Sequence, residues 1–363
     1  MRLHDLTERD GPFTSVYLPI DPSTGVASER LAPHWGSVRR DLEEQGADRS
    51  VLDLVERTVL DLSDSPASGV AVVVDGNGDS LVQLSDEAPE RAIGRWGDVP
   101  SLSMLIRWRR ADVPHLVVVA DREGADIWVR DSRGQLPGDP RREVDGDTEH
   151  IHRGHAGGWS QRRFQQRSEN TWERNAAGVA EEIHQLAEKV GAELIVATGD
   201  VRALGFLDEH LPPASKDRLR VVEAGGRSDP DAATRVAEEA DHLVSDLVAR
   251  RSVDAMERFA VARGNDLAVE GPGPTLEALS ASRVDLLLVH DDPDDERTAH
   301  SGAAGVPVAA ERHTIVDLGE EPEAGRLVDV AVRAALLTGA DVEIVPAHGP
   351  NVPEGGIGGV LRG

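Results

Sequence analysis

The sequence predicts a multidomain protein that combines α/β and α+β architecture. Short apolar runs, typical of buried strands, alternate with amphipathic helical patterns along the chain. A length of 363 residues also exceeds what one ordinary hydrophobic core organises. Changes in the pattern indicate three domains: an N-terminal α+β domain at residues 1–110, a middle α/β domain at 111–262 and a C-terminal αβα sandwich at 263–363.

The N-terminal domain opens with an apolar run at Thr14–Ile20, which predicts a strand. A helical pattern follows around Val38–Leu62, and a second strand is expected at Gly69–Val74. Asp75-Gly76-Asn77-Gly78 then reads as a turn, because glycine and asparagine favour the backbone angles that turns require. This domain holds no evident catalytic cluster.

The middle domain begins at His115 with two strands joined by a turn at Glu123-Gly124. A polar stretch from Asp131 to His150 is expected to project, because it is too hydrophilic to pack. The remaining predicted elements are a helix at Asn170–Val190, a buried strand at Glu193–Thr198, a short alternation at Arg220–Val222 and a long helix at Asp231–Ala262. Together they form a three-layer α/β pattern.

The C-terminal domain begins near Gly264. Its predicted elements are a helix at Pro274–Ser282, a strand at Val284–Val289, an apolar segment at Val306–Ala310, a helix at Gly325–Thr338 and a strand at Val342–Pro346. Its two glycine-rich segments, Gly271-Pro272-Gly273 and Gly355–Gly359, lack the lysine and the strand-loop-helix context of a phosphate-binding loop. We interpret both as turns.

The charge composition indicates a halophilic protein. The formal net charge is -27, and of 39 basic residues only Lys189 and Lys216 are lysines, so 37 are arginines. Carboxylate-rich surfaces with little lysine suit molar salt, where the Debye length is about 3 Å. RNA binding in such a medium depends on shape, stacking and short-range arginine contacts rather than on counterion release.

Other features of the composition exclude several classes of site. Cysteine is absent, which excludes disulfides, thiol nucleophiles and cysteine-ligated metal centres. No apolar run of about 20 residues exists for a membrane helix. The N-terminal residues lack an apolar signal core, so we expect a cytoplasmic protein.

The most distinctive segment is a basic island at His150–Arg174. It contains five arginines and three histidines against two acids, whereas the whole chain is strongly acidic. Such a local reversal of charge is typical of a surface that binds phosphate groups. Gly157-Gly158 permits close approach of the backbone to a ligand, and Gln161 offers both a donor and an acceptor.

The chain resembles the archaeo-eukaryotic peptide-chain release factors and Pelota, in the divergent bacterial-type branch. That branch includes Vms-Ankzf-type peptidyl-tRNA hydrolases and Balon-like ribosome hibernation factors. The resemblance is carried by Asp285–Val289, Gly339–Pro346 and Gly355–Arg362, which look like the ribosomal-protein-like third domain of the family. The middle domain resembles the ribonuclease-H-like domain whose tip carries a Gly-Gly-Gln loop.

Two departures from the family pattern affect the expected function. Trp159 and Ser160 separate Gly158 from Gln161, whereas in release factors the glutamine follows the glycines directly. The stop-codon reader of the family uses a lysine-bearing loop and a cysteine-bearing motif, but this chain has no cysteine and no lysine before Lys189. Codon-specific termination is therefore not expected.

The resemblance implies a translation factor that binds the ribosomal A site independently of stop codons, in ribosome rescue or hibernation. The implied catalytic residues are Gly157, Gly158 and Gln161. The implied RNA contacts are Arg153, Trp159, Arg162, Arg163 and Arg167, since guanidinium groups suit phosphates and indoles stack on bases. Implied partners are ribosomal RNA, peptidyl-tRNA and a translational GTPase, with no membrane, DNA or cofactor. Gln161 decides whether peptidyl-tRNA is hydrolysed or the site is only occluded.

The residues also leave an alternative open, a free-standing metal-dependent α/β hydrolase. His150, His152 and His155 have a spacing that can gather a metal. The acidic run His290–Glu296 is a second candidate cation site, but it lacks calcium-loop spacing and is better explained as a solvated loop. A nuclease reading of the middle domain would depend on a third set of residues, Asp121, Asp126 and Asp200.

Overall fold

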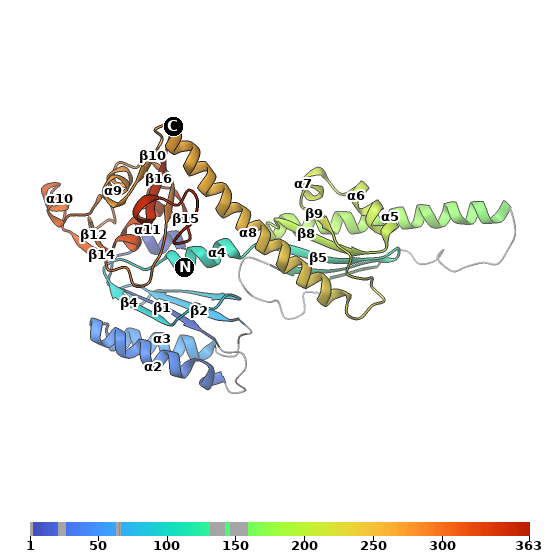
Figure 1. Ribbon diagram of the computed structural model, residues 1–363. Helices are drawn as coiled ribbons and strands as arrows, with labels where there is room; N and C mark the ends of the chain where they lie inside the picture. Colours follow the sequence, from blue (N-terminus) through green and yellow to red (C-terminus); the bar gives the residue numbers. More distant parts are fainter. Residues whose placement is uncertain (1–2, 21–26, 63–64, 66, 131–141, 146–158) are drawn as a thin grey trace. The chain divides into compact units, whose positions relative to one another are not determined.

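A computed structural model describes residues 3–20, 27–62, 65, 67–130, 142–145 and 159–363. Side chains are described for these residues except 27–33, 142, 143, 145 and 159–170. The chain divides into two compact units (Figure 1). Unit 1 comprises residues 1–110 and 249–363, and unit 2 comprises residues 111–248.

The N-terminal part of unit 1 is a four-stranded antiparallel sheet with two helices on one face. Its elements are α1 (Leu3–Thr7), β1 (Phe13–Pro19), α2 (Ala27–Gln45), α3 (Arg49–Asp61), β2 (Gly69–Val74), β3 (Ser80–Ser85), β4 (Ile93–Gly97) and α4 (Ser103–Ala111). The strand order is β3-β2-β1-β4. The predicted helical region is two helices, because Gly46 adopts a φ of 102° and Asp48 caps α3 through Ser50 N.

The C-terminal part of unit 1 contains a four-stranded sheet and a three-stranded sheet. Its elements are α9 (Pro272–Ser280), β10 (Ala268–Glu270), β11 (Val284–Val289), β12 (Thr298–Ser301), β13 (Val308–Ala309), α10 (Arg312–Asp317), β14 (Glu323–Arg326), α11 (Leu327–Leu337), β15 (Asp341–Ile344) and β16 (Ile357–Leu361). The sheet orders are β10-β16-β11-β15 and β13-β12-β14. α11 is buried along most of its length.

The glycine-rich end of the chain corrects one prediction. Gly355 and Gly356 form a turn, but Ile357–Leu361 is strand β16, which lies between β10 and β11. At Gly358 a Cβ atom would lie 2.8 Å from the Val269 carbonyl oxygen, so only glycine fits there without a shift. Close packing, and not turn formation, therefore explains this glycine.

One hydrophobic core joins the N-terminal and C-terminal parts of unit 1. Phe13, Tyr17 and Trp108 belong to the same buried cluster as Val328 and Val330 of α11. The other face of the N-terminal sheet packs separately against α2 and α3. The two sequence-distant segments of unit 1 thus share a core that neither has alone.

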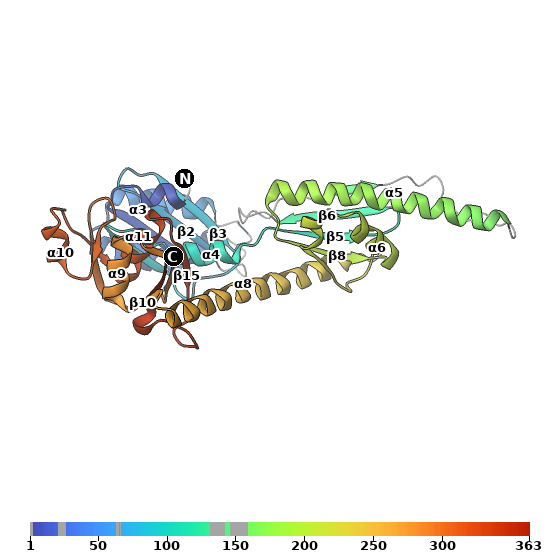
Figure 2. The same cartoon turned by 90° about the horizontal axis from the view of Figure 1, so that it is seen from above.

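Unit 2 is a five-stranded mixed sheet with helices on both faces (Figure 2). Its elements are β5 (His115–Ala120), β6 (Gly124–Arg130), β7 (Arg142–Asp145), α5 (Trp159–Val190), β8 (Leu194–Gly199), α6 (Val201–His210), α7 (Pro213–Lys216), β9 (Leu219–Val221) and α8 (Ala232–Gly264), whose last part belongs to unit 1. The order is β7-β6-β5-β8-β9. β5, β6 and β7 are antiparallel, whereas β8 and β9 run parallel to β5.

This order and these directions are those of a ribonuclease-H-like sheet, and the expected mixed multidomain fold is confirmed. One detail was wrong: Arg142–Asp145 was expected to project with its polar neighbours, yet it forms β7 and pairs with β6. Backbone hydrogen bonds hold this edge strand, and they do not require an apolar sequence. In the described part of the chain, no helix combines the length and apolarity needed to cross a membrane.

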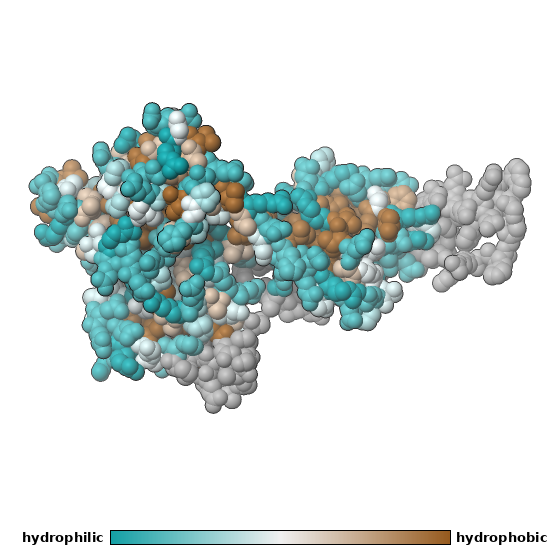
Figure 3. Space-filling view, in the orientation of Figure 1, coloured by the Kyte–Doolittle hydropathy of each residue, from teal (hydrophilic) through white to brown (hydrophobic). Residues whose placement is uncertain are grey.

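Surface composition agrees with the acidic sequence. Hydrophilic residues cover most of the face drawn in Figure 3, with smaller apolar areas between them. Large apolar side chains that stay exposed are scattered, and they include Val201 and Val221 in unit 2 and Val316 and Leu318 in unit 1. Single exposed apolar residues of this kind are normal for a folded protein.

Candidate RNA-binding tip and its base

The predicted tip residues fall into two groups. Arg153, Gly157 and Gly158, together with His150, His152 and His155, lie outside the described residues. The remaining predicted residues are in the first part of α5, where the backbone is described: Trp159, Gln161, Arg162, Arg163 and Arg167. The structure therefore gives the backbone setting of the second group only.

The helix α5 begins at Trp159, immediately after Gly157-Gly158. Gln161 is consequently the third residue of α5. With about 3.6 residues per turn, positions 163, 167 and 174 fall on one side of α5, and position 161 falls on the opposite side. Positions 163 and 167 of the predicted site thus lie on the side of α5 opposite position 161.

The C-terminal half of α5 is anchored in the core of unit 2. Val179, Ile183 and Leu186 are buried against the sheet at helical spacing. By contrast, residues 159–170 have the sequence WSQRRFQQRSEN, which has no apolar stripe. One half of the helix is therefore a core element, and the other half has the composition of a polar surface helix.

A side-chain clamp lies at the junction between these halves. The Arg122 guanidinium lies 4.6 Å from the centroid of the Trp172 ring. The same guanidinium donates to both carboxylate oxygens of Asp200, with Nε–Oδ1 at 3.2 Å and Nη2–Oδ2 at 2.9 Å. The Asn175 side chain donates to the Arg122 carbonyl oxygen at 3.1 Å. Arg122 thereby ties α5 to the β5–β6 turn and to the start of α6.

Asp200 has a second role that strengthens the clamp. It caps α6, because its Oδ1 accepts hydrogen bonds from Arg202 N and Ala203 N. Burial acts to raise its pKa, but hydrogen bonds from Arg122 and from the helix amides outweigh it and hold the pKa below the ordinary range. Asp200 is therefore ionised at neutral pH, as an ion pair requires.

The three carboxylates considered for a nuclease site are engaged by arginines. Arg227 contacts Asp121 at 3.3 Å and the buried Asp126 at 3.0 Å, while Arg122 binds Asp200. Burial lowers the pKa of Arg227, but these two carboxylates outweigh it and raise the pKa overall. Within the residues that the structure describes, no group of three potential metal ligands is present. The arrangement stabilises ion pairs and does not favour metal-dependent nuclease chemistry.

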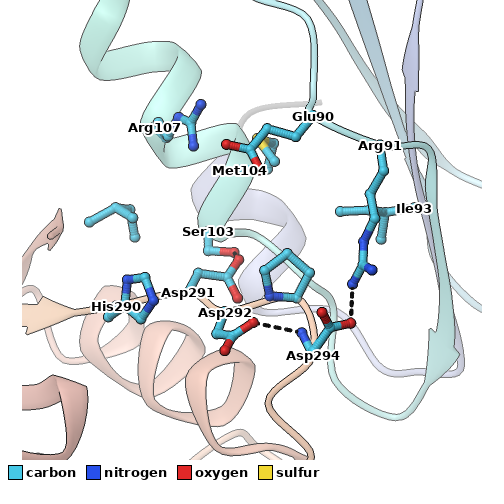
Figure 4. Close-up of a pocket in the computed structure, with 12 residues that line it drawn as sticks. Glu90, Arg91, Ile93, Ser103, Met104, Arg107, His290, Asp291, Asp292 and Asp294 are labelled. Carbon is cyan, nitrogen blue, oxygen red and sulfur yellow. Dashed lines mark hydrogen bonds and ion pairs between the residues drawn. The ribbon is translucent and has the colours of Figure 1, made fainter. Parts of the chain in front are cut away.

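The first five residues of the acidic run His290–Glu296 line a pocket of about 540 Å³ in unit 1 (Figure 4). Its carboxylates are engaged in specific interactions: Asp291 accepts from Ser103 and pairs with Arg326, and Asp294 pairs with Arg91. Asp292 accepts from the Asp294 amide. The run is a loop, as expected, and Asp292, Asp294 and Glu296 are exposed. Its bonds to Ser103 and Arg91 attach this wall of the pocket to the N-terminal part of unit 1.

A buried ion pair lies behind that wall. Asp329 on α11 is 3 % exposed, and its Oδ2 lies 3.4 Å from Nη1 of Arg326. Burial raises the pKa of Asp329 to about 6, although the Arg326 charge opposes the shift. Burial also raises the pKa of Tyr17 well above its ordinary value. These groups join segments of unit 1 that are distant in sequence.

Comparison with protein families identifies the middle part of the chain. Residues 114–265 match the model of bacterial archaeo-eukaryotic release factor family 2. This middle part of the chain is similar to the archaeo-eukaryotic release factors, in their bacterial branch. The matched residues include the sheet of unit 2, the clamp and all of α5.

Two curated relatives cover nearly the full length of the chain. They are the uncharacterized proteins Rv2629 and MT2704 from two strains of Mycobacterium tuberculosis, H37Rv and CDC 1551 / Oshkosh. Each is 27 % identical over 370 residues, which covers 99 % of this chain and 96 % of the relative. The similarity to these relatives therefore extends over nearly the whole chain and not only over its middle part.

Solved structures of translation factors are similar at low identity. An archaeal translation termination factor, aRF1, is 17 % identical with a TM-score of 0.26, and covers 99 % of this chain and 96 % of its own. Pelota from Archaeoglobus fulgidus is 14 % identical with a TM-score of 0.34, covering 81 % and 79 %. A ribosome-bound archaeal Pelota is 14 % identical with a TM-score of 0.40, covering 99 % and 92 %. These TM-scores are too low for the structural similarities to support a family assignment.

Proposed function

We propose that this protein is a translation factor that binds the ribosomal A site without reading a codon and places residues 150–170 near the peptidyl-transferase centre. The observation that carries the proposal is the family match over residues 114–265, which contains the basic island. Ribosomal RNA is rich in phosphate, and arginine forks suit phosphate oxygens. The named relatives of known type act in translation termination or bind ribosomes.

The construction of α5 supports a tip that reaches away from the sheet. At 1.5 Å per residue, Trp159 lies about 20 Å along the helix axis from Trp172, where the clamp holds the helix. A helix that is fixed at its base and polar beyond it is suited to enter a narrow, RNA-lined space. Gly157-Gly158 would then sit at the far end, where close backbone approach matters.

Within this function, we favour occlusion of the peptidyl-transferase centre over hydrolysis of peptidyl-tRNA. Catalysis by a release-type tip depends on positioning a water and an amide beside the ester. Gln161 is in the first turn of α5, three positions after Gly158, so the glycine pair does not set its backbone position directly. This separation supports a hibernation factor that shelters an idle ribosome and leaves its peptidyl-tRNA intact.

Three further features belong to the same proposal. A translational GTPase partner would deliver the protein and dock on the C-terminal domain, residues 263–363. The site of action would be the cytoplasm, and binding would persist at high salt because of the halophilic composition. The basic side chains that contact RNA would be Arg153, Arg162, Arg163 and Arg167, with Trp159 stacking on a base.

The direct test is co-sedimentation with purified ribosomes over a range of KCl concentrations. Wild-type protein should pellet with ribosomes, and a variant with Arg163→Gln and Arg167→Gln should lose at least tenfold in affinity. The matched control is Arg258→Gln in α8, which removes one exposed arginine from unit 1. Absence of wild-type protein from the pellet at every salt concentration would overturn the proposal and favour the metal-dependent hydrolase, for which metal content of the purified protein is the first measurement.

A further inference from the structure

A second pocket lies at the base of the tip, between α5 and α6. It has a volume of about 290 Å³ and is lined by Trp172, Arg202, Gly205, Phe206 and Glu209. Pockets for drug-sized ligands are typically about 300–1,000 Å³, so this one has room for a single ring system. None of these residues was singled out from the sequence as part of a site.

The lining combines groups that recognise a planar heterocycle. Trp172 and Phe206 provide two aromatic side chains from different helices, and aromatic residues bind unstacked bases through their ring faces. Arg202, Gly205, Phe206 and Glu209 share one face of α6, because they are spaced by three, four and seven residues. Since Gly205 has no side chain, the space above the helix backbone stays open between the aromatic rings.

Gly205 is not required by the packing of the protein. A Cβ atom at this position would meet no heavy atom within 4 Å, so the chain itself would tolerate a side chain there. Glycine inside a helix also costs about 1 kcal/mol relative to alanine. The open space at Gly205 leaves room for a planar group to lie close to the helix backbone.

The polar groups of the pocket favour one base. Arg202 supplies donors and Glu209 supplies acceptors, and the two residues lie about 10 Å apart along the helix axis. Guanine presents acceptors at O6 and N7, which suit an arginine, and donors at N1 and N2, which suit a carboxylate. Uracil, cytosine and adenine do not have one edge with two acceptors and another edge with two donors.

The pocket is held in shape by neighbouring contacts. Arg122 lies against Trp172 and binds Asp200, which caps α6 through Arg202 N. At a second point, His210 of α6 lies 3.8 Å from Glu173 of α5. The two helices that line the pocket are therefore fixed relative to each other, and a base would enter a preformed site.

We propose that this α5–α6 pocket binds an unpaired guanine base of RNA. The inference rests on the proposed function in one respect: ribosomal RNA would supply the base when the tip is bound. It adds a base-specific contact at the foot of the tip to the phosphate contacts expected along it.

The test uses fluorescence anisotropy with labelled heptaribonucleotides UUUGUUU, UUUAUUU and UUUUUUU. Wild-type protein should bind the guanine-containing oligonucleotide about tenfold more tightly than the other two. Gly205→Leu fills the pocket and should abolish this preference, and Glu209→Gln should reduce it. Gly178→Leu is the matched control, because Gly178 is an exposed α5 glycine outside the pocket with open space at its Cβ position.

Equal binding of the three oligonucleotides by wild type, or an unchanged guanine preference in Gly205→Leu, would overturn the inference. Thermal unfolding of both leucine variants checks that each is folded, and both replace a helical glycine by a better helix former. Ribosome co-sedimentation separates the two claims. A wild-type protein that pellets with ribosomes but shows no guanine preference contradicts the pocket alone, whereas a guanine preference without ribosome binding contradicts the proposed function alone.

Discussion

Arg122 and Trp172, fifty positions apart in sequence, are stacked with the guanidinium carbon 4.6 Å from the ring centroid. Trp172 belongs to the helix that leads to the basic island, and Arg122 belongs to the turn between two central strands. A cation–π contact of this type contributes about 0.5–2 kcal/mol, and the bond to Asp200 fixes the guanidinium plane. The stack therefore joins the sheet of unit 2 to the base of the proposed tip.

Loss of this stack should loosen the base of α5 without unfolding the sheet. In Arg122→Ala, amide hydrogen exchange at residues 171–178 should accelerate at least tenfold, because the cation–π contact and the Asp200 ion pair are both removed. Exchange in β5 and β8 should stay at wild-type rates. Arg220→Ala is the control, since the Arg220 guanidinium donates to the carbonyl oxygens of Asp217 and Leu219, which are close to it in sequence. Equal acceleration in β8 would mean that Arg122 supports the whole unit.

A buried arginine should hold the N-terminal segment to α11. Arg333 is 1 % exposed, donates to the carbonyl oxygens of Thr7 and Arg9, and pairs with Glu323 at 3.1 Å. Arg333→Met would leave the Glu323 carboxylate half-buried without its partner, which typically costs about 3–5 kcal/mol. Urea unfolding should report this loss, together with faster proteolysis near the N-terminus.

The exposed pair Arg258–Asp285 provides the matched comparison for Arg333. Both side chains are more than two-fifths exposed, and such surface pairs contribute about 0–1 kcal/mol. Arg258→Met should therefore leave the free energy of unfolding within 1 kcal/mol of wild type. If Arg333→Met is equally mild, Arg333 is not needed to hold the N-terminal segment to α11.

Asp329 should give unit 1 a measurable pH dependence. Its pKa rises from an ordinary 3.8 to about 6 in the fold, so the native state binds a proton more tightly than the unfolded state between these values. The stability contributed by the protonated form is complete below pH 3.8 and is lost as the pH rises through about 6. Relative to Asp329→Asn, wild type should lose about 2 kcal/mol between pH 4 and pH 7. Parallel curves for the two proteins would contradict a raised pKa.

The packing glycine in β16 gives a prediction that is independent of function. Gly358→Ala would place a Cβ 2.8 Å from the Val269 carbonyl oxygen and 3.0 Å from the Phe259 ring. Such overpacking typically costs about 1–3 kcal/mol. The replacement Gly363→Ala, where a Cβ meets nothing within 4 Å, should leave the unfolding midpoint in urea unchanged.

The fold was largely predictable because its strands are apolar runs bounded by turn residues. Gly69–Val74 and Val284–Val289 were predicted with the bounds that the structure has. Strand β7 was not, since only Val144 of its four residues is apolar and its pairing with β6 depends on backbone hydrogen bonds. Local pattern carries no information on such edge strands.

Of the two candidate sites, only the basic island could be predicted from the sequence, because its amino-acid composition differs from that of the rest of the chain. The basic island is visible in sequence because five arginines cluster in an acidic chain. The α5–α6 pocket is not, because Trp172 and Phe206 come from separate helices and meet only in the fold. The mid-helix Gly205 is a local signal of this pocket in the sequence.

The central claim is that the tip occupies the peptidyl-transferase centre without cleaving peptidyl-tRNA. The most direct measurement is the puromycin reaction of ribosomes that carry labelled peptidyl-tRNA in the P site and an empty A site. Saturating protein should slow peptidyl-puromycin formation at least tenfold, and no peptide should be released when puromycin is absent. An unchanged puromycin rate, or puromycin-independent release that Gln161→Ala abolishes, would contradict occlusion.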